Sequence, residues 1–281
     1  IALSWQCQCL LYYVKLFNII LETCYIPSNW SEGIIIPIVK NKGDSKDPEK
    51  YRPITLLSCV GKLFISILNE RLNRRIHQNE ILENQACFRL FHIFTLTSII
   101  EILKHQQKKL FCCYIDFTKA FDSVLRYGLW QKLLQYGIEG NFFKVTYNMY
   151  SNIKSCIRNP VNEPNSYSDF FKCSVGVRQG KQISTVLFSL FLNDLEEFLV
   201  SNNNNGIDLS NPTNELLPIS RILLLLYADD TILLTLQKCI NDFMDDCTER
   251  KLNVNIRTSN HYLPVDVGPW DSQLPKMLFM R

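Results

Sequence analysis

The sequence predicts an α+β fold. Helix-like and strand-like segments interleave in mixed order, which is typical of this class rather than of a doubly wound parallel sheet. Of the 281 residues, 47% are hydrophobic, which is enough to build a sizeable core. The chain contains no internal repeats.

The expected elements follow from hydrophobic periodicity and from the turn residues that interrupt it. Helices are expected over residues 10–20, 58–76, 96–107, 124–138, about 140–150 and 183–200. Strands are expected over residues 33–40, 110–117, 153–158 and 168–175, and a hairpin has one strand ending at 227 and another beginning at 231. The charged stretch 40–53 and the polar stretch 202–215 are expected to be loops.

Charge and cysteine content narrow the class of protein. Lys and Arg number 30 and Asp and Glu 27, and the resulting net charge of +3 does not by itself indicate a nucleic-acid partner. The 11 cysteines form no CxxC pair, and the four histidines show no ligand spacing. A zinc site and a disulfide framework are therefore disfavoured. Reduced thiols favour an intracellular protein of the nucleus or cytoplasm rather than a secreted one.

The first 26 residues are apolar enough to raise the question of a membrane segment. Polar residues interrupt them, and no apolar run approaches the roughly 20 residues that a spanning helix needs. They also lack the basic start and the small-residue cleavage site of a signal peptide. We expect an amphipathic helix that docks on the domain or on a neighbour outside this chain, and no membrane partner.

Two adjacent acids stand between two apolar runs in RILLLLYADDTILLTL (221–236). Asp229 and Asp230 would lie at a hairpin tip, and Asp116 is near the end of another apolar run. Three carboxylates at strand ends are suited to Mg²⁺, which would offset the cost of burying like charges. Two ions about 3.5–4 Å apart can hold the attacking 3′-oxygen and the leaving pyrophosphate oxygens in nucleotidyl transfer.

A plain structural interpretation competes with this one. A Tyr-x-Asp-Asp tetrapeptide occurs by chance in roughly a few per cent of chains this long. Asp also tolerates turn geometry, so an Asp pair is an ordinary hairpin signal. The tetrapeptide alone leaves both interpretations open, and further motifs decide between them.

The further motifs resemble those of reverse transcriptases from non-LTR (LINE-type) retrotransposons. YADD (227–230) resembles the family's catalytic hairpin, and YIDFTKAFDSV (114–124) its first catalytic motif. GVRQGKQISTVLFSLFLNDL (176–195) resembles the segment that follows that motif. IIIPIVKNKGD with YRPITLLSCVGKLF, and NQACFR (84–89), resemble the fingers blocks. The matches occur in the family's order and cover roughly residues 30–258.

The resemblance implies a right-hand polymerase fold with fingers and palm, a mixed or antiparallel palm sheet with packed helices, and no thumb in this chain. Residues 1–30 would form an N-terminal helical extension, 31–109 the fingers and 110–258 the palm. The tail 259–281 matches nothing in the family. The implied activity is RNA-directed DNA polymerisation, in which a primer 3′-OH attacks a dNTP on an RNA template. The implied partners are the RNA template, the DNA primer and dNTP.

The resemblance also implies which residues act. Asp116, Asp229 and Asp230 would be the catalytic acids that bind two Mg²⁺ ions, with Mn²⁺ as an alternative. The residues that match positions around the dNTP are Phe117, Phe121, Gln179, Gly180, Arg52 and Lys40. The Phe121 ring would exclude a 2′-hydroxyl by clash, and a core Phe is the alternative. Arg52 and Lys40 would meet dNTP phosphates, with ordinary loop residues as the alternative.

Template and primer would lie between fingers and palm. The residues expected to contact nucleic acid are Lys62, Arg71, Arg74, Arg75, Lys119, Arg126, Arg178 and Tyr227. Basic residues near 71–75 also suit a helix C-terminus, which is the simpler explanation for them. Asp122 matches a recurrent acid of the family, and we expect it to cap a helix rather than to bind metal.

The expected lack of a thumb in this chain favours an alternative function, and several residues also depart from the family pattern. Cys87 and Lys251 stand where the family usually has Gly, and Thr185 where it usually has Pro. Lys181-Gln182 replaces a Cys-Pro-like pair. The alternative is a catalytically inactive remnant of a retrotransposon, or a host-adopted RNA-binding or interaction module on the same fold.

Overall fold

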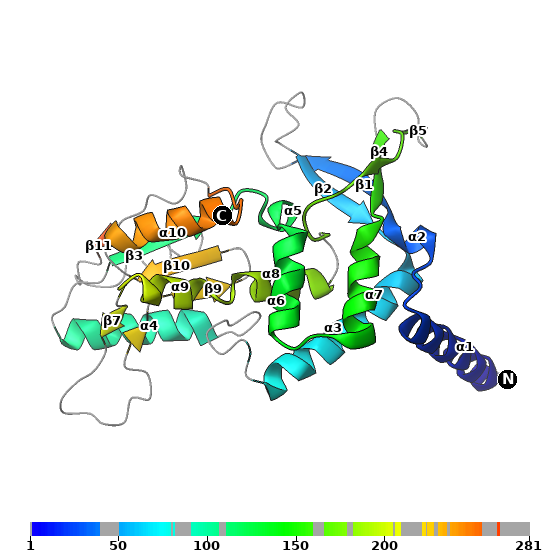
Figure 1. Cartoon of the computed structure of the whole chain (residues 1–281), viewed down its shortest axis with the longest axis horizontal. Helices are drawn as coiled ribbons and strands as arrows, with labels where there is room; N and C mark the ends of the chain where they lie inside the picture. Colours follow the sequence, from blue (N-terminus) through cyan, green and yellow to red (C-terminus); the bar gives the residue numbers. More distant parts are fainter. Residues whose placement is uncertain are drawn as a thin grey trace. The chain divides into compact units, whose positions relative to one another are not determined.

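The computed structural model describes the chain as two compact units, shown in Figure 1. The first unit comprises residues 1–82 and 119–192, and the second comprises residues 83–118 and 193–281. The described residues are 2–39, 51–79, 81, 91–106, 111–159, 166–178, 182–204, 206–208, 221–222, 224–227, 230–234, 237–254 and 263–264. Because the two units interleave along the sequence, they differ from the consecutive fingers and palm ranges, which stay a prediction.

The first unit contains a mixed five-stranded sheet. Its strands are β1 (Glu32–Val39), β2 (Tyr51–Leu56), β4 (Lys154–Asn159), β5 (Ser166–Tyr167) and β6 (Phe171–Lys172). The order is β2-β1-β4-β5, and β6 also pairs with β4. β1 runs antiparallel to β2, with Ile36 opposite Ile54, and parallel to β4, with Ile34 opposite Cys156.

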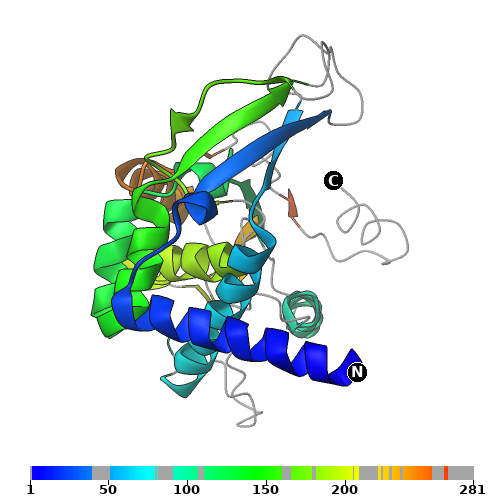
Figure 2. The same ribbon diagram turned by 90° about the vertical axis from the view of Figure 1, so that its right-hand side faces the viewer.

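Helices cover one side of this sheet, as Figure 2 shows. They are α1 (Ala2–Thr23), α2 (Ser28–Ser31), α3 (Cys59–Gln78), α5 (Ala120–Ser123), α6 (Arg126–Gln135), α7 (Gly140–Ser151) and α8 (Gln182–Leu192). α8 packs against α3, α5 and α6, and residues 186–192 of α8 are all buried. A helix that is apolar on all sides belongs in a core, and α8 supplies the centre of this one.

The N-terminal helix α1 docks through its C-terminal half. Phe17 and Ile20 are buried, and the Phe17 ring lies 5.2 Å from that of Phe64, centroid to centroid. Leu10 and Tyr12 are 63% and 72% exposed, so the preceding turns extend away from the unit. Within the described part of the chain, no helix combines the length and apolarity needed to span a bilayer.

The second unit contains an antiparallel four-stranded sheet in the order β11-β3-β10-β9. Its strands are β3 (Phe111–Asp116), β9 (Leu224–Tyr227), β10 (Asp230–Leu234) and β11 (Leu263–Pro264). Helices α4 (Phe91–His105), α9 (Leu195–Ser201) and α10 (Gln237–Glu249) belong to the same unit, as does the short ladder of β7 (Ile207–Asp208) with β8 (Arg221–Ile222).

The structure confirms most expected elements and corrects several. The helix expected over 124–138 is the shorter α6, whereas α5 precedes the expected range, and the helix expected over 183–200 is interrupted at Asn193-Asp194. β2 begins at Tyr51, inside the expected loop 40–53, and β7 lies inside the expected loop 202–215. The YADD hairpin is confirmed as an antiparallel pair, although β10 begins one residue earlier than expected. α10 was not predicted.

Candidate active site

The register of the second sheet places two of the three candidate acids opposite each other. Asp116 is the last residue of β3 and Asp230 the first of β10, and their Cα atoms are partners in the ladder. Asp230 is also the partner of Tyr227 across the hairpin. Residues 228 and 229 connect this pair. Both lie outside the described residues, and they include the third acid, Asp229. The described backbone therefore brings segments more than a hundred residues apart in sequence to one rung of the sheet.

The sheet beneath this rung is a tightly packed core. Ile115 is 5% exposed and Leu233 is fully buried. The Phe117 ring, which follows Asp116 directly, is 3% exposed and lies 6.1 Å from the ring of Phe243 on α10. Since adjacent carboxylates repel, their separation has to be fixed by the surrounding fold rather than by the acids themselves. The buried side chains of β3, β10 and α10 provide that constraint.

The backbone after Asp116 is also fixed. Phe117 forms a bridge with Val254, and the Thr118 amide donates to the Asn253 carbonyl over 2.7 Å. Phe117 was expected among residues around the dNTP, with the backbone after Asp116 against the triphosphate. Its side chain is instead a core side chain, and the next amide already has an internal acceptor. Any contact of this stretch with a triphosphate would have to use other atoms.

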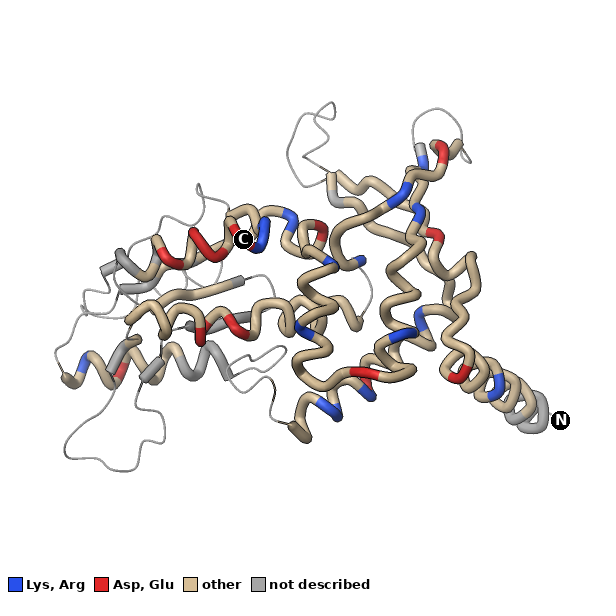
Figure 3. The backbone as a smooth tube through the Cα atoms, viewed as in Figure 1, with Lys and Arg blue, Asp and Glu red and all other residues tan. Residues whose placement is uncertain are grey.

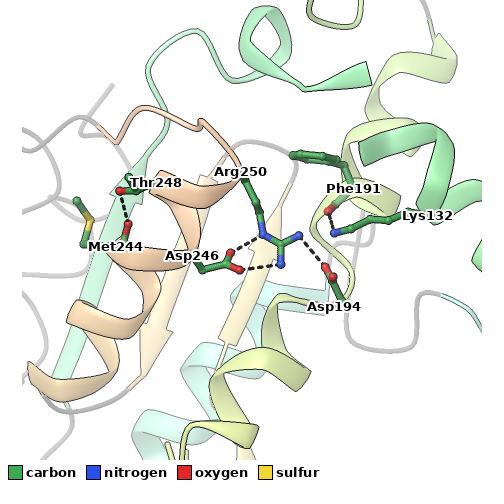
Figure 4. A network of polar contacts seen from close by, with 7 residues as sticks. All are labelled: Lys132, Phe191, Asp194, Met244, Asp246, Thr248 and Arg250. Carbon is green, nitrogen blue, oxygen red and sulfur yellow. Dashed lines mark hydrogen bonds and ion pairs between the residues drawn. The ribbon is translucent and has the colours of Figure 1, made fainter. Parts of the chain in front are cut away.

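An ion-pair network ties α10 to the start of α9 (Figure 4). Arg250 donates to both carboxylate oxygens of Asp246, at 2.5 and 2.8 Å, and to Asp194 over 2.8 Å. Asp246 is only 4% exposed. Burial alone would lower the pKa of Arg250, but its hydrogen bonds to Asp246 and Asp194 raise that pKa overall. The guanidinium is therefore a permanent cation that neutralises a buried carboxylate.

The residue expected to contact the sugar of a dNTP, Phe121, belongs to the first unit. Phe121, on α5, is half-buried, and its ring lies 5.2 Å from that of the buried Phe188 on α8. Partial exposure is compatible with both interpretations of Phe121, as a sugar gate and as a core ring. Asp122 lies inside α5 rather than at its cap, which is Lys119. The prediction that Asp122 caps a helix is therefore wrong.

Four other residues expected at the dNTP are not fully described. Gln179, Gly180 and Lys40 lie outside the described residues. The backbone of Arg52 is on β2, where it is the partner of Ile38, but its side chain is outside the description. Their predicted contacts stay predictions.

The basic residues of α3 are exposed but do not share one face. Lys62 and Arg71 are nine positions apart, which at about 100° per residue places them half a turn apart. Arg74 pairs with Glu70 over 3.1 Å, and both side chains are more than 60% exposed. Arg75 donates to the Gly137 carbonyl that follows α6. Only Arg71 and Arg74 project from neighbouring positions away from the buried stripe of the helix.

Two other predicted phosphate contacts have a different environment. Arg178 is 7% exposed, and its guanidinium donates to the carbonyls of Trp30, Ser31 and Lys154. Arg126 is half-buried and donates to four backbone carbonyls. The structure contradicts a phosphate contact for Arg178, because its donors face the protein interior. Lys119 is exposed at the start of α5, and the Tyr227 side chain is not described.

Acidic residues predominate on the described helices α9 and α10, as Figure 3 shows. They are Glu196, Glu197, Asp242, Asp245, Asp246 and Glu249. Asp246 is buried and neutralised by Arg250, but the exposed Glu197, Asp245 and Glu249 would repel a phosphate backbone. Sequence reasoning did not use this feature, although the acids are visible in the printed sequence.

The donor set is chemically suited to a divalent cation. Asp116, Asp229 and Asp230 offer carboxylate oxygens, which are the ligands that Mg²⁺ and Mn²⁺ prefer. Among the side chains that the structure describes, no group of three or more His, Cys, Asp and Glu is placed to hold a metal ion. The three candidate acids are not among those side chains, so the metal site stays a prediction supported by the backbone register.

Comparisons with known proteins agree on one family. A family profile described as "Reverse transcriptase (RNA-dependent DNA polymerase)" matches residues 39–262. The chain is 31% identical over 245 residues to a probable RNA-directed DNA polymerase from transposon BS of Drosophila melanogaster, covering 84% of this chain and 25% of that protein. It is 29% identical over 248 residues to the RNA-directed DNA polymerase from mobile element jockey of Drosophila funebris, covering 86% of this chain and 25% of that protein. The chain thus spans about a quarter of the length of these relatives.

Solved structures show the same fold. Apo telomerase from Candida tropicalis has a TM-score of 0.58 at 13% identity, covering 87% of this chain and 46% of that one. Telomerase from Candida albicans, in a complex with a fragment of telomeric RNA, has a TM-score of 0.53 at 14% identity and covers 82% and 43%. The likeness supports a mixed α/β fold of the telomerase type, and at this identity it indicates the fold alone.

Proposed function

Because this chain belongs to the reverse transcriptase (RNA-dependent DNA polymerase) family, related to those of non-LTR retrotransposons, we propose that it is an RNA-directed DNA polymerase domain. It would extend a DNA primer with dNTP on an RNA template. The observation that carries this proposal is the register of β3 and β10, which sets Asp116 opposite Asp230 at the start of the YADD hairpin's second strand.

In this proposal Asp116, Asp229 and Asp230 hold two divalent cations, Mg²⁺ or Mn²⁺. When bound, such cations lower the pKa of the attacking hydroxyl and neutralise charge on the leaving pyrophosphate. The protein's part is to keep the acids in a fixed geometry, which the packed core of β3, β10 and α10 provides. Phe121 would restrict the sugar of the incoming nucleotide to the 2′-deoxy form by steric exclusion.

The proposal assigns parts of the fold to a polymerase hand. The four-stranded sheet of the second unit would be the palm, and the sheet that contains β1 and β2 would belong to the fingers. Lys40 and Arg52 flank the β1–β2 connection, where a dNTP triphosphate would be met. Exposed Arg71 and Arg74, which lie at neighbouring positions of α3, would contribute non-specific attraction to the phosphates of template and primer.

A second candidate is a catalytically inactive remnant, or a host-adopted RNA-binding or interaction module. The departures at Cys87, Lys181-Gln182 and Thr185 from the family's motifs favour it. Both candidates predict binding of a primed RNA template, and only the polymerase predicts incorporation.

The test is primer extension by the purified chain on poly(rA) primed with oligo(dT), with dTTP and Mg²⁺ or Mn²⁺. We expect incorporation that disappears in Asp229→Asn and persists in Asp245→Asn, which removes an exposed charge from α10. RNA binding without incorporation by the intact chain would favour the remnant. Incorporation that survives Asp229→Asn would contradict the proposed role of the acids.

A further inference from the structure

Residues 173–178 form a segment between β6 and α8 that is bound closely to α5 and its neighbours; we call it the lead-in segment. The Gly176 amide donates to the Val124 carbonyl over 2.9 Å, and the Val177 amide donates to the Phe121 carbonyl over 2.6 Å. At its start, the Cys173 amide donates to the Ile153 carbonyl over 3.0 Å. The lead-in segment therefore follows the backbone of Phe121, the predicted sugar gate.

The side chain of Arg126 holds this segment from α6. Its Nε donates to Gly176 and its Nη2 to Val175, at 2.8 and 2.9 Å, and its Nη1 donates to Cys173 and Tyr150, both at 2.8 Å. Its guanidinium also lies 5.5 Å from the centre of the Tyr150 ring. Three of the four acceptors are carbonyls of the lead-in segment. One planar, five-donor group thus fixes the path of a stretch that has no regular secondary structure.

The backbone of the lead-in segment lies very close to that of α5 at Gly176. Its φ is +79°, a conformation that side chains disfavour. A Cβ at this position would lie 2.5 Å from the Asp122 carbonyl oxygen and 2.8 Å from the Asp122 Cα. Because these neighbours are backbone atoms of α5, they have little room to move. The lead-in segment is therefore constrained by Arg126 and by the contact of Gly176 with α5.

We propose that Arg126 is a positioning residue for nucleotide binding, acting through the lead-in segment. The inference rests on the proposed polymerase function. It follows from the hydrogen bond between Val177 and Phe121, which couples the path of the segment to the predicted sugar gate. The segment also leads directly into Gln179-Gly180, the pair that matches the family's position beside the incoming base pair. Lys cannot replace Arg here, because one ammonium cannot reach four carbonyls on different residues.

The experiment compares Arg126→Lys and Arg126→Met with Lys144→Met, which removes an exposed cation from α7 of the same unit. In primer extension, we expect KM for dTTP to rise on the order of 10- to 100-fold in both Arg126 variants. Affinity for the primed template should stay within about twofold, and discrimination between dTTP and UTP should fall. Lys144→Met should match the wild type. A uniform loss of kcat with unchanged KM and discrimination would overturn the proposal, because general destabilisation predicts that pattern.

Two further measurements keep the proposal testable if Arg126→Met does not fold. Gly176→Ala pushes the segment from the α5 side without changing charge, and we expect it to raise KM for dTTP and lower discrimination in the same way. Hydrogen exchange needs no activity: the Gly176 and Val177 amides should exchange at least about 10-fold faster in Arg126→Lys than in the wild type. Unchanged exchange overturns the positioning role. If the wild type incorporates no dTTP, but the Gly176 and Val177 amides exchange faster in Arg126→Lys, then the polymerase function is overturned and the structural role of Arg126 stands.

Discussion

Asp116 and Asp230 are direct partners across the β3–β10 ladder, although 114 positions separate them in sequence. Like charges at directly opposed positions of an antiparallel pair destabilise a sheet, on the scale of the roughly 0.2–1 kcal/mol that a favourable cross-strand pair contributes. A fold that keeps both acids on one rung therefore carries a cost in the absence of a cation. The cost can be measured as a change in the free energy of unfolding, and in how that free energy responds to a divalent cation.

Asp116→Asn should make the metal-free chain slightly more stable, by up to about 1 kcal/mol, because it removes one of two opposed charges. In millimolar Mg²⁺ the order should reverse, since the wild type gains binding free energy that the variant loses. Thermal unfolding with EDTA and with Mg²⁺ measures both effects. Asp245→Asn, on the exposed side of α10, is the control and should respond to Mg²⁺ as the wild type does. A wild-type melting temperature that does not respond to Mg²⁺ would count against the metal site.

Arg250→Met should destabilise the chain by roughly 2–4 kcal/mol, because it leaves the buried Asp246 without its cation. We expect a smaller loss in the free energy of unfolding than for a fully buried pair, because the Asp194 side chain is 41% exposed. Urea unfolding monitored by circular dichroism gives the difference. Glu70→Gln is the matched control: it breaks the exposed pair with Arg74 and should cost no more than about 0.5 kcal/mol. Equal losses in the two variants would contradict a buried network.

Local patterns predicted the parts of the fold that depend on local residues. The Ser58 hydroxyl accepts from the Gly61 amide at the start of α3, and a Ser before an apolar run is a readable helix start. β2 was partly assigned to a loop because the stretch 40–53 is charged and contains Gly and Pro. β2 is the edge strand, which tolerates proline, and strand order is not visible in the sequence. α10 did have a signal, since Cys239, Phe243 and Cys247 recur every four residues and are buried.

The parts that the sequence could not predict depend on distant residues. The break between α8 and α9 falls at Asn193-Asp194, and Asp194 is bound by Arg250, 56 positions away. Arg178 was interpreted as a surface cation, but its acceptors include Trp30, 148 positions away. Composition shows that a residue is charged, and only the tertiary structure shows which carbonyls surround it. The position of Asp116 and of the Asp pair at strand ends was predicted, but the register that opposes Asp116 to Asp230 depends on the tertiary structure.

Cys247 should make the chain less stable at alkaline pH. Burial, and then the neighbouring Asp246 carboxylate, raise the pKa of this thiol from 9.0 to about 12. In the unfolded chain the thiol ionises from about pH 9, whereas in the folded chain it stays protonated. Between these values the unfolded state binds fewer protons, so stability falls as pH rises, by at most about 1.4 kcal/mol per pH unit for this group. Below about pH 9 the thiol is protonated in both the folded and the unfolded chain, so it does not make stability depend on pH there.

Urea unfolding at about pH 8 and about pH 10.5 tests this assignment. Cys247→Ala should lose stability at both values through the cavity it leaves, but its loss between the two should be smaller than that of the wild type. Cys59→Ala, which removes an exposed thiol, should keep the wild-type dependence. The same pH dependence in all three proteins would show that Cys247 does not titrate differently in the folded chain.

Thr231, next to Asp230, should be replaceable by Val with a gain in stability. It is 1% exposed, and its hydroxyl oxygen has no hydrogen-bond partner within the described residues. A buried hydroxyl without a partner costs on the order of 1–3 kcal/mol, so Thr231→Val should raise the free energy of unfolding by about 1 kcal/mol. Thr146→Val is the matched control, because the Thr146 hydroxyl is equally buried but donates to the Phe142 carbonyl over 2.9 Å. That variant should lose roughly 0.5–1.5 kcal/mol. If Thr231→Val is instead destabilised as much as Thr146→Val, then the Thr231 hydroxyl has a partner, and the neighbourhood of Asp230 is more polar than the buried side chains of β10 indicate.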